Sequence, residues 1–560
     1  MYNIPSTTPQ NPTSEGSKLF LLVLVCIAWI LPGLVGHEPW KPDDAQAFGV
    51  VYHMLKSGDW IAPTLAGEPF LDNPPFFYWV AALFAKLFSP LFPLHDGARF
   101  ASGFFMAITL SLTALTARKL YGVGIGRLSV LMLIGSVGLL VHAHLLVIDL
   151  ALMTATALVM AGLTLFTIST RPYMYGLLTG TGIGMAFLSK GLSEAILLAC
   201  IPVCLPLAGS TWRSRQYLLH ALIALAASLP WLLLWPILLN SHAPVLFETW
   251  WDSQISQILA GFDLNSIKGN IKYFAQTLPW FAWPAWPIVL WGLWRNRSRN
   301  LSKLNIQLPL IAIIILTAAL PLVPNDRDLF ALPMLVPLSI LAAGSIQLLK
   351  RGAAHALDWF GTMTFGLIAF VLWLGWIAMV FGHPQQFGQH LLKLQPDYTP
   401  TFEVFPFIVA AILTILWMVM VFHSLKTTRR AIVNWAIGIT LMWGLLGTLW
   451  LPWVDTGRSY RALFTSLKNA VPERYNCIAG RFVGEPQRAM IDYYAGITIT
   501  RESMLVSRQC DYLLVQEDVQ NKNAEVMPNR LKLWEGHRPG DKKENYVLYR
   551  IAPTLPSDYP

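Results

Sequence analysis

The chain has 560 residues, of which 55% are hydrophobic and only 13% are charged. Soluble domains carry about 25% charged residues, so the composition excludes an ordinary soluble protein and indicates one that is surrounded by membrane lipids. The formal net charge of +9 does not call for nucleic acid, because membrane proteins collect Lys and Arg in their cytoplasmic loops. No nucleic-acid partner is expected.

Apolar segments of membrane-spanning length recur along the chain, separated by short polar stretches. The first runs from Leu19 to Val35 and lacks a small-residue cleavage site, so it is interpreted as a retained helix and not as a signal peptide. Because a span needs about 20 apolar residues, about thirteen transmembrane helices are predicted. They cover residues 18–36, 98–117, 121–141, 150–170, 173–189, 193–210, 217–239, 279–294, 306–323, 330–349, 361–381, 402–424 and 431–451.

Every basic cluster between the spans follows an even-numbered span. These clusters are Arg118 and Lys119, Arg171, Arg213 and Arg215, the group from Arg295 to Lys303, Lys350 and Arg351, and the group from Lys426 to Arg430. Because short cytoplasmic loops are rich in Lys and Arg, the N-terminus is predicted to be cytoplasmic. The first loop, 37–97, and the segment after residue 454 are then predicted to lie on the outer face.

The chain changes character near its C-terminal end. Residues 1–454 are predicted to form the transmembrane domain, and residues 455–560 a small soluble α/β domain with frequent charges. Strands are expected at 475–483, 511–516 and 546–551, and a helix at 486–494. Cys477 and Cys510 lie in this domain and could form a disulfide if it is outside the cytoplasm.

The first outer loop is too long for a simple turn. A helix is predicted to begin at Asp43, because acidic residues in a first turn satisfy free N–H groups and the helix dipole. Its apolar residues recur at helical spacing, so it is expected to lie along the membrane surface. Pro74 and Pro75 are expected to open a second helix, whose aromatic residues suit the headgroup zone.

Four carboxylates fall on the outer side near the boundary between water and lipid: Asp43, Asp44, Asp72 and Asp149. Carboxylates at such positions are costly and are usually functional or paired. Each also has a structural explanation, since Asp43, Asp44 and Asp149 can cap helices, and Asp72 can be a turn residue before proline. Their common location favours a shared site.

Two cations lie on the same face. Lys190 could simply extend toward the interface, and Arg327 could pair locally with Asp326 or Asp328. Beside the carboxylates, however, the two cations suit a phosphate leaving group next to an acid/base centre.

Three parts of the first loop carry a resemblance to a known family. Residues 42–47 (PDDAQA), their spacing to 54–60 and residues 72–79 (DNPPFFYW) resemble the first periplasmic loop of bacterial GT-C membrane glycosyltransferases. The nearest groups are the protein O-mannosyltransferase-like family and the aminoarabinose transferases that modify lipid A. Residues 187–191 (FLSKG) and the pattern of Arg327 before residues 332–337 are similar to later motifs of that family.

The resemblance implies a GT-C fold in a bacterial inner membrane, with periplasmic juxtamembrane helices and a periplasmic C-terminal domain. It implies a polyprenyl-phosphate-linked hexose or pentose as donor and transfer with inversion. Asp43 matches the family's catalytic acidic residue, and Asp149 matches a second family carboxylate. Lys190 and Arg327 match candidate contacts of the donor phosphate.

Asp44, Asp72 and Asn73 are expected to contact substrate. They are also where the chain departs from the family, which usually has Asp-Glu where this chain has Asp43-Asp44, and often has Glu-Lys where it has Asp72-Asn73. The departure removes a lysine beside the donor phosphate or the acceptor. The sequence does not distinguish between three acceptors: lipid A, another glycan and a protein hydroxyl.

The expected mechanism is an inverting transfer. Asp43 accepts the acceptor's proton during attack on the anomeric carbon, and Asp149 stabilises a transition state that resembles an oxocarbenium ion. No cofactor is expected, and a divalent metal bound by Asp72 or by the pair His142 and His144 is the alternative.

A transporter or lipid flippase is the rival function, because charges within a membrane often mark transport paths. Transporters tend to contain internal repeats, which this sequence lacks. An adhesion or scaffold role for the C-terminal segment is a third function, and it leaves the charged first loop unexplained.

Overall fold

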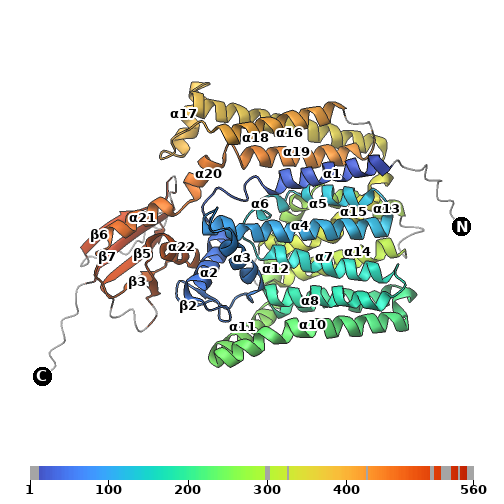
Figure 1. Ribbon diagram of the computed structural model, residues 1–560, viewed down its shortest axis with the longest axis horizontal. Coiled ribbons are helices and arrows are strands. Elements are labelled where there is room, and N and C mark those ends of the chain that lie inside the picture. The colour runs from blue at the N-terminus through green and yellow to red at the C-terminus, as the bar shows by residue number, and fades with distance from the viewer. Residues whose placement is uncertain are drawn as a thin grey trace.

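The computed structural model describes residues 12–296, 303–323, 327–423, 427–502, 504, 510–518, 531–539, 541 and 543–551. A bundle of long helices forms the larger part of the molecule, and a five-stranded sheet with short helices lies beyond one end of the bundle (Figure 1). The expected basic residues Arg297, Arg299 and Lys426, and also Asp326, lie outside the described residues.

The bundle and its outer end contain long helices, shorter helices and a two-stranded hairpin. They are α1 Pro12–Ile30, α2 Asp43–Ser57, β1 Thr64–Leu65, β2 Glu68–Pro69, α3 Phe76–Phe88, α4 Leu94–Tyr121, α5 Ile125–Ile134, α6 Leu139–His142, α7 Asp149–Phe166, η1 Pro172–Tyr175, α8 Gly176–Lys190, α9 Leu192–Ala208, η2 Ser210–Arg213, α10 Arg215–His242, α11 Pro244–Ala260, α12 Leu264–Phe281, α13 Ala285–Asn296, α14 Leu304–Ala319, η3 Leu320–Leu322, η4 Asp328–Met334, α15 Leu335–Ser345, η5 Ile346–Leu348, α16 Arg351–Phe381, α17 Gln385–Leu394, α18 Val404–His423, α19 Arg430–Leu446 and α20 Leu451–Arg458.

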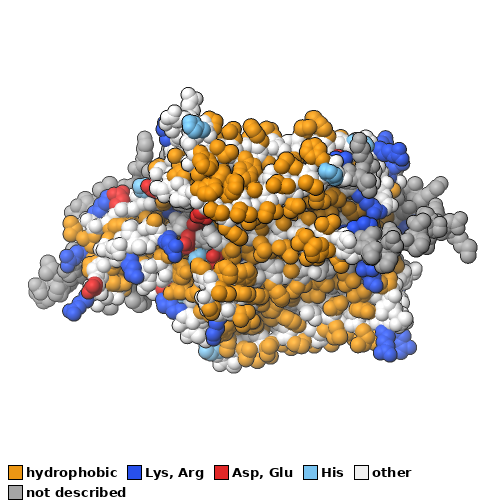
Figure 2. Space-filling model, turned by 45° about the horizontal axis from the view of Figure 1, so that its top comes forward, with side chains coloured by type: hydrophobic (Ala, Val, Ile, Leu, Met, Phe, Trp, Pro, Cys, Tyr) orange, Lys and Arg blue, Asp and Glu red, His pale blue; other side chains and the backbone are white. Residues whose placement is uncertain are grey.

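Seven helical segments of the described chain are long and apolar enough to cross a membrane, or eight if the bent pair α19 and α20 is one span. Each of the thirteen expected spans overlaps a helix of the structure, but several of these helices, such as α5 and α9, are too short to count as spans by themselves. The fold class is therefore confirmed, and the number thirteen stays a prediction. Figure 2 shows hydrophobic side chains, in orange, over the visible face of the bundle, with Asp and Glu in this view gathered toward the end that carries the sheet.

The third expected span is broken. The sequence pattern predicts one helix over 121–141, whereas α5 ends before Gly135 and α6 begins after Gly138. The backbone N–H of Gly138 donates to Phe281, and a Cβ on Gly138 would lie 2.2 Å from the Phe281 ring. The interruption therefore exists because another segment of the chain packs directly on the Gly138 backbone.

The first loop lies across the end of the bundle, between the bundle and the sheet (Figure 1). As expected, α2 begins at Asp43 and α3 begins directly after Pro75. The apolar face of α2 was expected to lie on the membrane surface, but its residues Val50, Val51 and Met54 are fully buried within the protein. The reason is that α2 packs against α22, a helix of the sheet domain.

The sheet domain follows α20. Its elements are α21 Arg461–Ala470, β3 Ile478–Arg481, α22 Glu485–Ala495, β4 Ile499–Arg501, β5 Tyr512–Asp518, β6 Leu531–Gly536 and β7 Glu544–Arg550. The strand order is β4-β3-β5-β7-β6, with β3 parallel to both β4 and β5 and with β7 antiparallel to β5 and β6. The three expected strands and the expected helix overlap β3, β5, β7 and α22.

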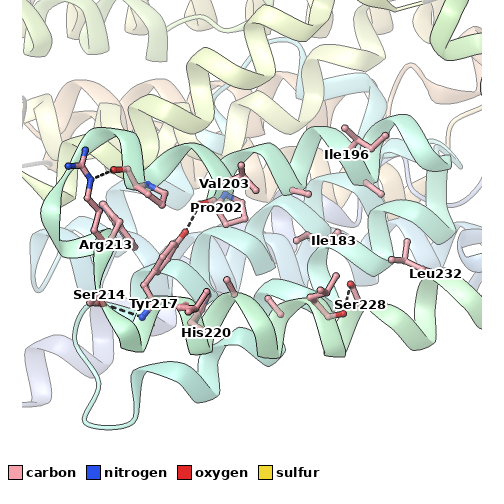
Figure 3. A pocket seen from close by; sticks show the side chains of 18 of the residues that line it. Ile183, Ile196, Pro202, Val203, Arg213, Ser214, Tyr217, His220, Ser228 and Leu232 are labelled. Atoms are coloured by element: carbon pink, nitrogen blue, oxygen red, sulfur yellow. Dashed lines mark hydrogen bonds between the residues drawn. The ribbon is translucent and has the colours of Figure 1, made fainter.

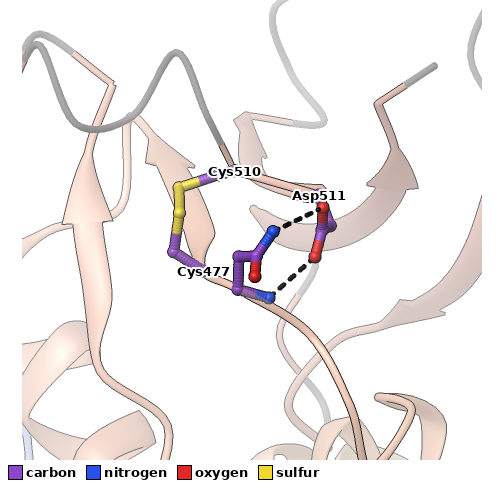
Figure 4. The surroundings of a disulfide bond; sticks show 4 residues. Cys477, Cys510 and Asp511 are labelled. Atoms are coloured by element: carbon purple, nitrogen blue, oxygen red, sulfur yellow. Dashed lines mark hydrogen bonds between the residues drawn. A yellow bond between two sulfur atoms is a disulfide. The ribbon is translucent and has the colours of Figure 1, made fainter. Parts of the chain in front are cut away.

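A disulfide joins the starts of two strands of this sheet. Cys477, just before β3, is bonded to Cys510, just before β5 (Figure 4). Beside it, the Asp511 carboxylate accepts a hydrogen bond of 2.7 Å from the backbone N–H of Asn476. The bond closes a loop of 33 residues and so limits the freedom of the unfolded domain.

Ion pairs attach the sheet domain to the first loop. Lys56 of α2 lies 2.7 Å from Asp492 of α22, and Glu68 of the β1–β2 hairpin lies 2.7 Å from Arg488. The two helices also approach closely, since a Cβ on Gly49 would lie 2.3 Å from the Cβ of Ala489. The sheet domain therefore forms part of the wall around the outer end of the bundle.

Candidate active site

A small polar cavity of about 160 Å³ lies between the first loop and the ends of the bundle helices. It brings together six of the seven residues that the sequence predicts for the site. The residues that line it are Asp43, Gln46, Ala47, Phe70, Asp72, Asn73, Tyr78, Leu146, Val147, Ile148, Asp149, Lys190, Arg327 and Leu329.

Asp43 and Arg327 form one side of the cavity. Asp43 is the first residue of α2, and the N-cap position before it is occupied by Pro42. The Asp43 carboxylate lies 2.5 Å from the guanidinium of Arg327. An ion pair of Arg327 with the neighbouring Asp328 was considered from the sequence, but Asp328 lies 3.1 Å from His142. An ion pair between residues 284 positions apart ties the first loop to the segment before η4.

Asp149 and Lys190 form the other side. Asp149 is the first residue of α7, Lys190 is the last residue of α8, and the two side chains lie 3.0 Å apart. The Lys190 side chain is only 14% exposed, and its ammonium lies 4.8 Å from the centre of the Phe330 ring. Lys190 therefore points into the protein and does not extend toward the interface. The ion pair of Asp149 and Lys190 stays together because either charge, if buried without its partner, would lower the stability of the protein.

Asp72 and Asn73 reach the cavity from the loop before α3. Burial raises the pKa of Asp72, and the nearby Glu485 carboxylate raises it further, while Arg501 acts in the opposite direction. Asp72 therefore holds a proton more readily than an exposed aspartate does. Its place in the cavity wall goes beyond the role of a turn residue before proline.

Gln46 and Tyr78 also line the cavity and were not singled out from the sequence. Gln46 lies one helical turn after Asp43, so the spacing i to i+3 could have placed both on one face. Tyr78 lies in an apolar run beside other aromatic residues, and nothing in that run distinguishes it. The Gln46 amide also donates a 2.8 Å hydrogen bond to Glu485 of α22.

Asp44 does not line the cavity. One carboxylate oxygen accepts from Leu146 N at 3.0 Å, the other accepts from Trp40 N at 3.0 Å, and both contact Arg99. Burial alone would raise the pKa of Asp44, but the Arg99 guanidinium holds it below the ordinary value. In this geometry each oxygen of Asp44 accepts two hydrogen bonds within the protein, so Asp44 holds the first loop to the bundle. Its predicted contact with substrate stays a prediction.

His142 and His144 do not form a pair of metal ligands. His142 contacts Asp328, while the two ring nitrogens of His144 each lie 2.7 Å from a backbone carbonyl oxygen, of Leu140 and Trp29. In the part of the chain that the structure describes, no three His, Cys, Asp or Glu side chains are grouped so as to hold a metal ion.

A second, apolar cavity of about 830 Å³ runs along the bundle between α8, α9 and α10 (Figure 3). It extends from Leu192 and Leu232 to Trp212 and Tyr217. Leu192 is two residues beyond Lys190, so this groove begins beside the polar cavity. The exposed side chain of Val203 on its rim indicates that the groove is open toward the lipid.

Sequence comparisons relate the chain to membrane sugar transferases. Residues 72–235 match the family described as dolichyl-phosphate-mannose-protein mannosyltransferase. The chain is 26% identical over 370 residues to undecaprenyl phosphate-alpha-4-amino-4-deoxy-L-arabinose arabinosyl transferase 1 of Pseudomonas fluorescens, a match that covers 60% of this chain and 61% of that protein. It is 26% identical over 373 residues to the enzyme of that type from Pseudomonas aeruginosa, covering 63% of this chain and 64% of the relative. The chain thus spans less than two thirds of the length of these relatives.

Structural comparisons cover nearly the whole chain. ArnT from Cupriavidus metallidurans bound to undecaprenyl phosphate matches with a TM-score of 0.64 at 14% identity, over 97% of this chain and 99% of that one. The apo oligosaccharyltransferase of Archaeoglobus fulgidus matches with a TM-score of 0.51 at 10% identity, over 91% of this chain and 70% of that one.

The resemblance expected from the first-loop motif is therefore confirmed. The apolar helices of the chain and its similarity to these relatives together indicate a multi-pass protein of the bacterial inner membrane. The chain has the GT-C fold of membrane glycosyltransferases, and its sequence is similar to those of the aminoarabinose transferases.

Proposed function

We propose that the chain is a glycosyltransferase that moves a sugar from a polyprenyl-phosphate donor to an acceptor at the outer face of the membrane. The observation that carries this proposal is the polar cavity, where Asp43 and Arg327 lie beside Asp149 and Lys190. Both the carboxylate needed to take a proton and the cations needed to hold a phosphate are present there.

The relatives support a lipid-linked donor. Their names describe transfer of an arabinose derivative from undecaprenyl phosphate, and the ArnT structure contains undecaprenyl phosphate. The apolar groove of this chain suits such a donor, because Leu192 at one end of the groove is two residues from Lys190 and Val203 on its rim is exposed. A phosphate at the cavity would thus place a long apolar tail in the groove.

In the proposed reaction the acceptor oxygen attacks the anomeric carbon from the face opposite the phosphate. Asp43 takes the acceptor's proton, the new C–O bond forms, and the bond from the anomeric carbon to the phosphate oxygen breaks. The electron pair leaves with the polyprenyl phosphate, whose charge Arg327 and Lys190 neutralise. Asp149 contacts Lys190 directly, so we assign it the positioning of that cation.

The role of the Asp43 carboxylate as general base is tested with the Asp43→Asn variant, in membranes supplied with a labelled polyprenyl-phosphate sugar. Loss of general base catalysis typically lowers the rate about 10²–10⁴-fold, so turnover is expected to fall by at least about a hundredfold. Asp252→Asn is the matched control, because Asp252 is an exposed carboxylate of α11. Full turnover by Asp43→Asn would refute the catalytic assignment.

We also propose that the reaction needs no cofactor, since Asp43 supplies the base and the two cations supply the counter-charge. The test is the same labelled assay after treatment with EDTA, in which turnover is expected to be unchanged. Loss of turnover that Mg²⁺ or Mn²⁺ restores would contradict this and point to a divalent metal.

A lipid transporter is the second candidate, because the groove and the buried charges could also serve transport. The names of the relatives favour transfer. Reconstituted vesicles separate the two functions, since transport of the labelled lipid without any covalent product would favour the transporter.

We infer the orientation from the basic clusters. Arg118 and Lys119 lie in the last turn of α4, and Arg215 begins α10. These helix ends lie at the side of the bundle opposite the first loop and the sheet domain (Figure 1). Because cytoplasmic loops collect Lys and Arg, the N-terminus is cytoplasmic and the sheet domain, 455–560 in the predicted boundaries, is periplasmic.

A further inference from the structure

The sheet domain contains a pocket of about 650 Å³ that the proposed reaction does not use. This volume lies within the range of about 300–1,000 Å³ that is typical of small-molecule sites. The sheet-domain pocket is lined by Gly480, Arg481, Phe482, Val483, Gly484, Glu485, Arg488, Arg501 and Glu502.

Its place in the sheet is one where ligands commonly bind. The pocket lies beyond the carboxyl ends of β3 and β4 and at the start of α22. From β3 the chain passes to β4 on one side and then to β5 on the other, so the strand order reverses between β3 and β5, beside the pocket. In open α/β sheets the crevice outside such a reversal is the usual ligand site.

Phe482 is the unusual residue of this pocket. Its side chain is 81% exposed, and its backbone has a φ of +61°, a conformation that is rare for a bulky residue. An exposed ring held on a strained backbone indicates a functional constraint. A flat aromatic face at the rim of a polar pocket suits the apolar face of a sugar ring.

The charges of the pocket are balanced. Arg481 pairs with Glu502 at 2.5 Å, and Arg501 pairs with Glu485 at 3.0 Å. The buried Arg488 pairs with Glu68, and its Nε makes no hydrogen bond to the rest of the described chain. The lining thus contains three cations and two carboxylates, and Glu68, which lies outside the lining, contacts both Arg488 and Arg501 at 2.7 Å. With Glu68 the three positive charges are matched by three carboxylates, so the pocket offers donors and acceptors without an excess of positive charge. This balance suits sugar hydroxyls, which both donate and accept, better than it suits a phosphate.

The sheet-domain pocket shares a wall with the polar cavity. Glu485 lines the pocket and accepts a 2.8 Å hydrogen bond from Gln46, which lines the cavity one helical turn from Asp43. Glu485 also acts on the pKa of Asp72, which lies in the cavity wall. The contact between Glu485 and Gln46 therefore separates a molecule held in the pocket from the cavity that contains Asp43.

We propose that the sheet-domain pocket binds the uncharged sugar units of a glycan acceptor and so presents that acceptor to Asp43. The Phe482 ring packs on the face of a sugar, while the Arg501 and Glu485 side chains hold its hydroxyls. This rests on the proposed function, in which the acceptor was left open among lipid A, another glycan and a protein.

Binding is tested on the full-length protein in nanodiscs, with an array that carries uncharged glycans, phosphorylated glycans and Ser/Thr peptides. The wild type is expected to bind uncharged glycans, and Phe482→Ala is expected to weaken that binding about tenfold, which corresponds to about 1.4 kcal/mol. Phe482→Trp keeps an aromatic face and should retain binding. Leu531→Ala is the matched control, because Leu531 is an exposed apolar residue on β6, at the opposite edge of the sheet.

Transfer kinetics supply the second readout. With a glycan that binds as acceptor, Phe482→Ala should raise the acceptor KM about tenfold and leave the donor KM and kcat within about twofold. Glycan binding that is equal in wild type and Phe482→Ala would refute the sugar site, as would binding that needs phosphate or occurs only with peptides. Absence of transfer by the wild type would instead count against the proposed function, so the two failures are distinguishable.

Discussion

Asp43 and Asp44 are neighbours in the first turn of α2, yet their side chains leave the helix about 100° apart. Asp43 consequently faces the polar cavity, while Asp44 faces the protein interior. There it meets Arg99, whose guanidinium also contacts Asp96 at 2.9 Å and the carbonyl oxygen of His37 at 2.7 Å. The pair Asp44 and Arg99 thus fixes the start of α2 to α4, and the position of Asp43 depends on it.

Arg99→Ala is expected to destabilise the protein strongly. The Arg99 side chain is only 1% exposed, and removal of one partner from a buried ion pair typically costs about 3–5 kcal/mol. The measurement is unfolding of the purified protein in detergent. Arg461→Ala is the control, because Arg461 pairs with Glu38 but is 63% exposed and should cost less than about 1 kcal/mol. Equal stabilities of the two variants would contradict the role of Arg99.

Asp44 should also make stability depend on pH. Its pKa is lowered in the folded protein, so the unfolded chain binds the proton more tightly. The resulting stabilisation is present above the ordinary aspartate pKa of about 3.9 and is lost as pH falls through the lower folded value. Unfolding measured from pH 7 down to pH 3 should show a shallower loss for Asp44→Asn than for the wild type. Asp252→Asn should keep the wild-type slope, and an unchanged slope in Asp44→Asn would overturn this assignment.

At the scale of elements, the contact between α2 and α22 connects the sheet domain to the active site. Gly49 permits the contact, because a Cβ there would lie 2.3 Å from the Cβ of Ala489. The ion pair of Lys56 with Asp492 and the hydrogen bond of Gln46 with Glu485 depend on the same approach. Moving α22 outward would therefore disturb the cavity wall near Asp43.

Gly49→Ala is expected to lower both stability and transfer, because overpacking of a close contact typically costs about 1–3 kcal/mol. The measurements are the unfolding midpoint and the labelled-sugar assay. Gly269→Ala in α12 is the matched control, since no atom lies within 4 Å of the added Cβ. If Gly49→Ala were as stable and active as Gly269→Ala, the close packing of α2 on α22 would not hold.

The helical elements were largely predictable, because a hydrophobic segment of sufficient length indicates a helix without reference to the rest of the chain. The break at Gly138 was not, since its cause is Phe281, which is distant in the sequence. The same limit applies to the site. Their positions at helix ends on the outer face predicted that Asp149 and Lys190 belong to the site. Their ion pair could not be predicted, because it depends on the packing of α7 on α8.

At the scale of the molecule, the sheet domain and the first loop share one end of the bundle (Figure 1). A disulfide within that domain agrees with a location outside the cytoplasm, because cytoplasmic thiols are kept reduced. Alternation of basic loops predicted this side for the domain. The individual contacts between domain and loop, such as Arg488 with Glu68, were beyond prediction, because they join residues of two separate segments.

The orientation and the disulfide can be tested together with a membrane-impermeant maleimide on spheroplasts. Cys477 and Cys510 should be unreactive until a reductant is added and should then react from outside. Cys477→Ser should also make the sheet domain more sensitive to proteolysis, because loss of a 33-residue loop closure costs about 3–4 kcal/mol. Labelling of Cys477 or Cys510 without reduction would contradict the bond, and labelling of these two cysteines only after lysis would contradict the orientation.

The pairing of each cation in the cavity with its own carboxylate bears on how the proposed reaction ends. Arg327 contacts Asp43 and Lys190 contacts Asp149, so an incoming phosphate competes with built-in counter-ions for both cations. After transfer, the same carboxylates can reclaim the cations and displace the spent carrier. Such exchange would prevent the negatively charged polyprenyl phosphate from staying bound and blocking the next reaction cycle. The two ion pairs would then assist product release as well as donor binding.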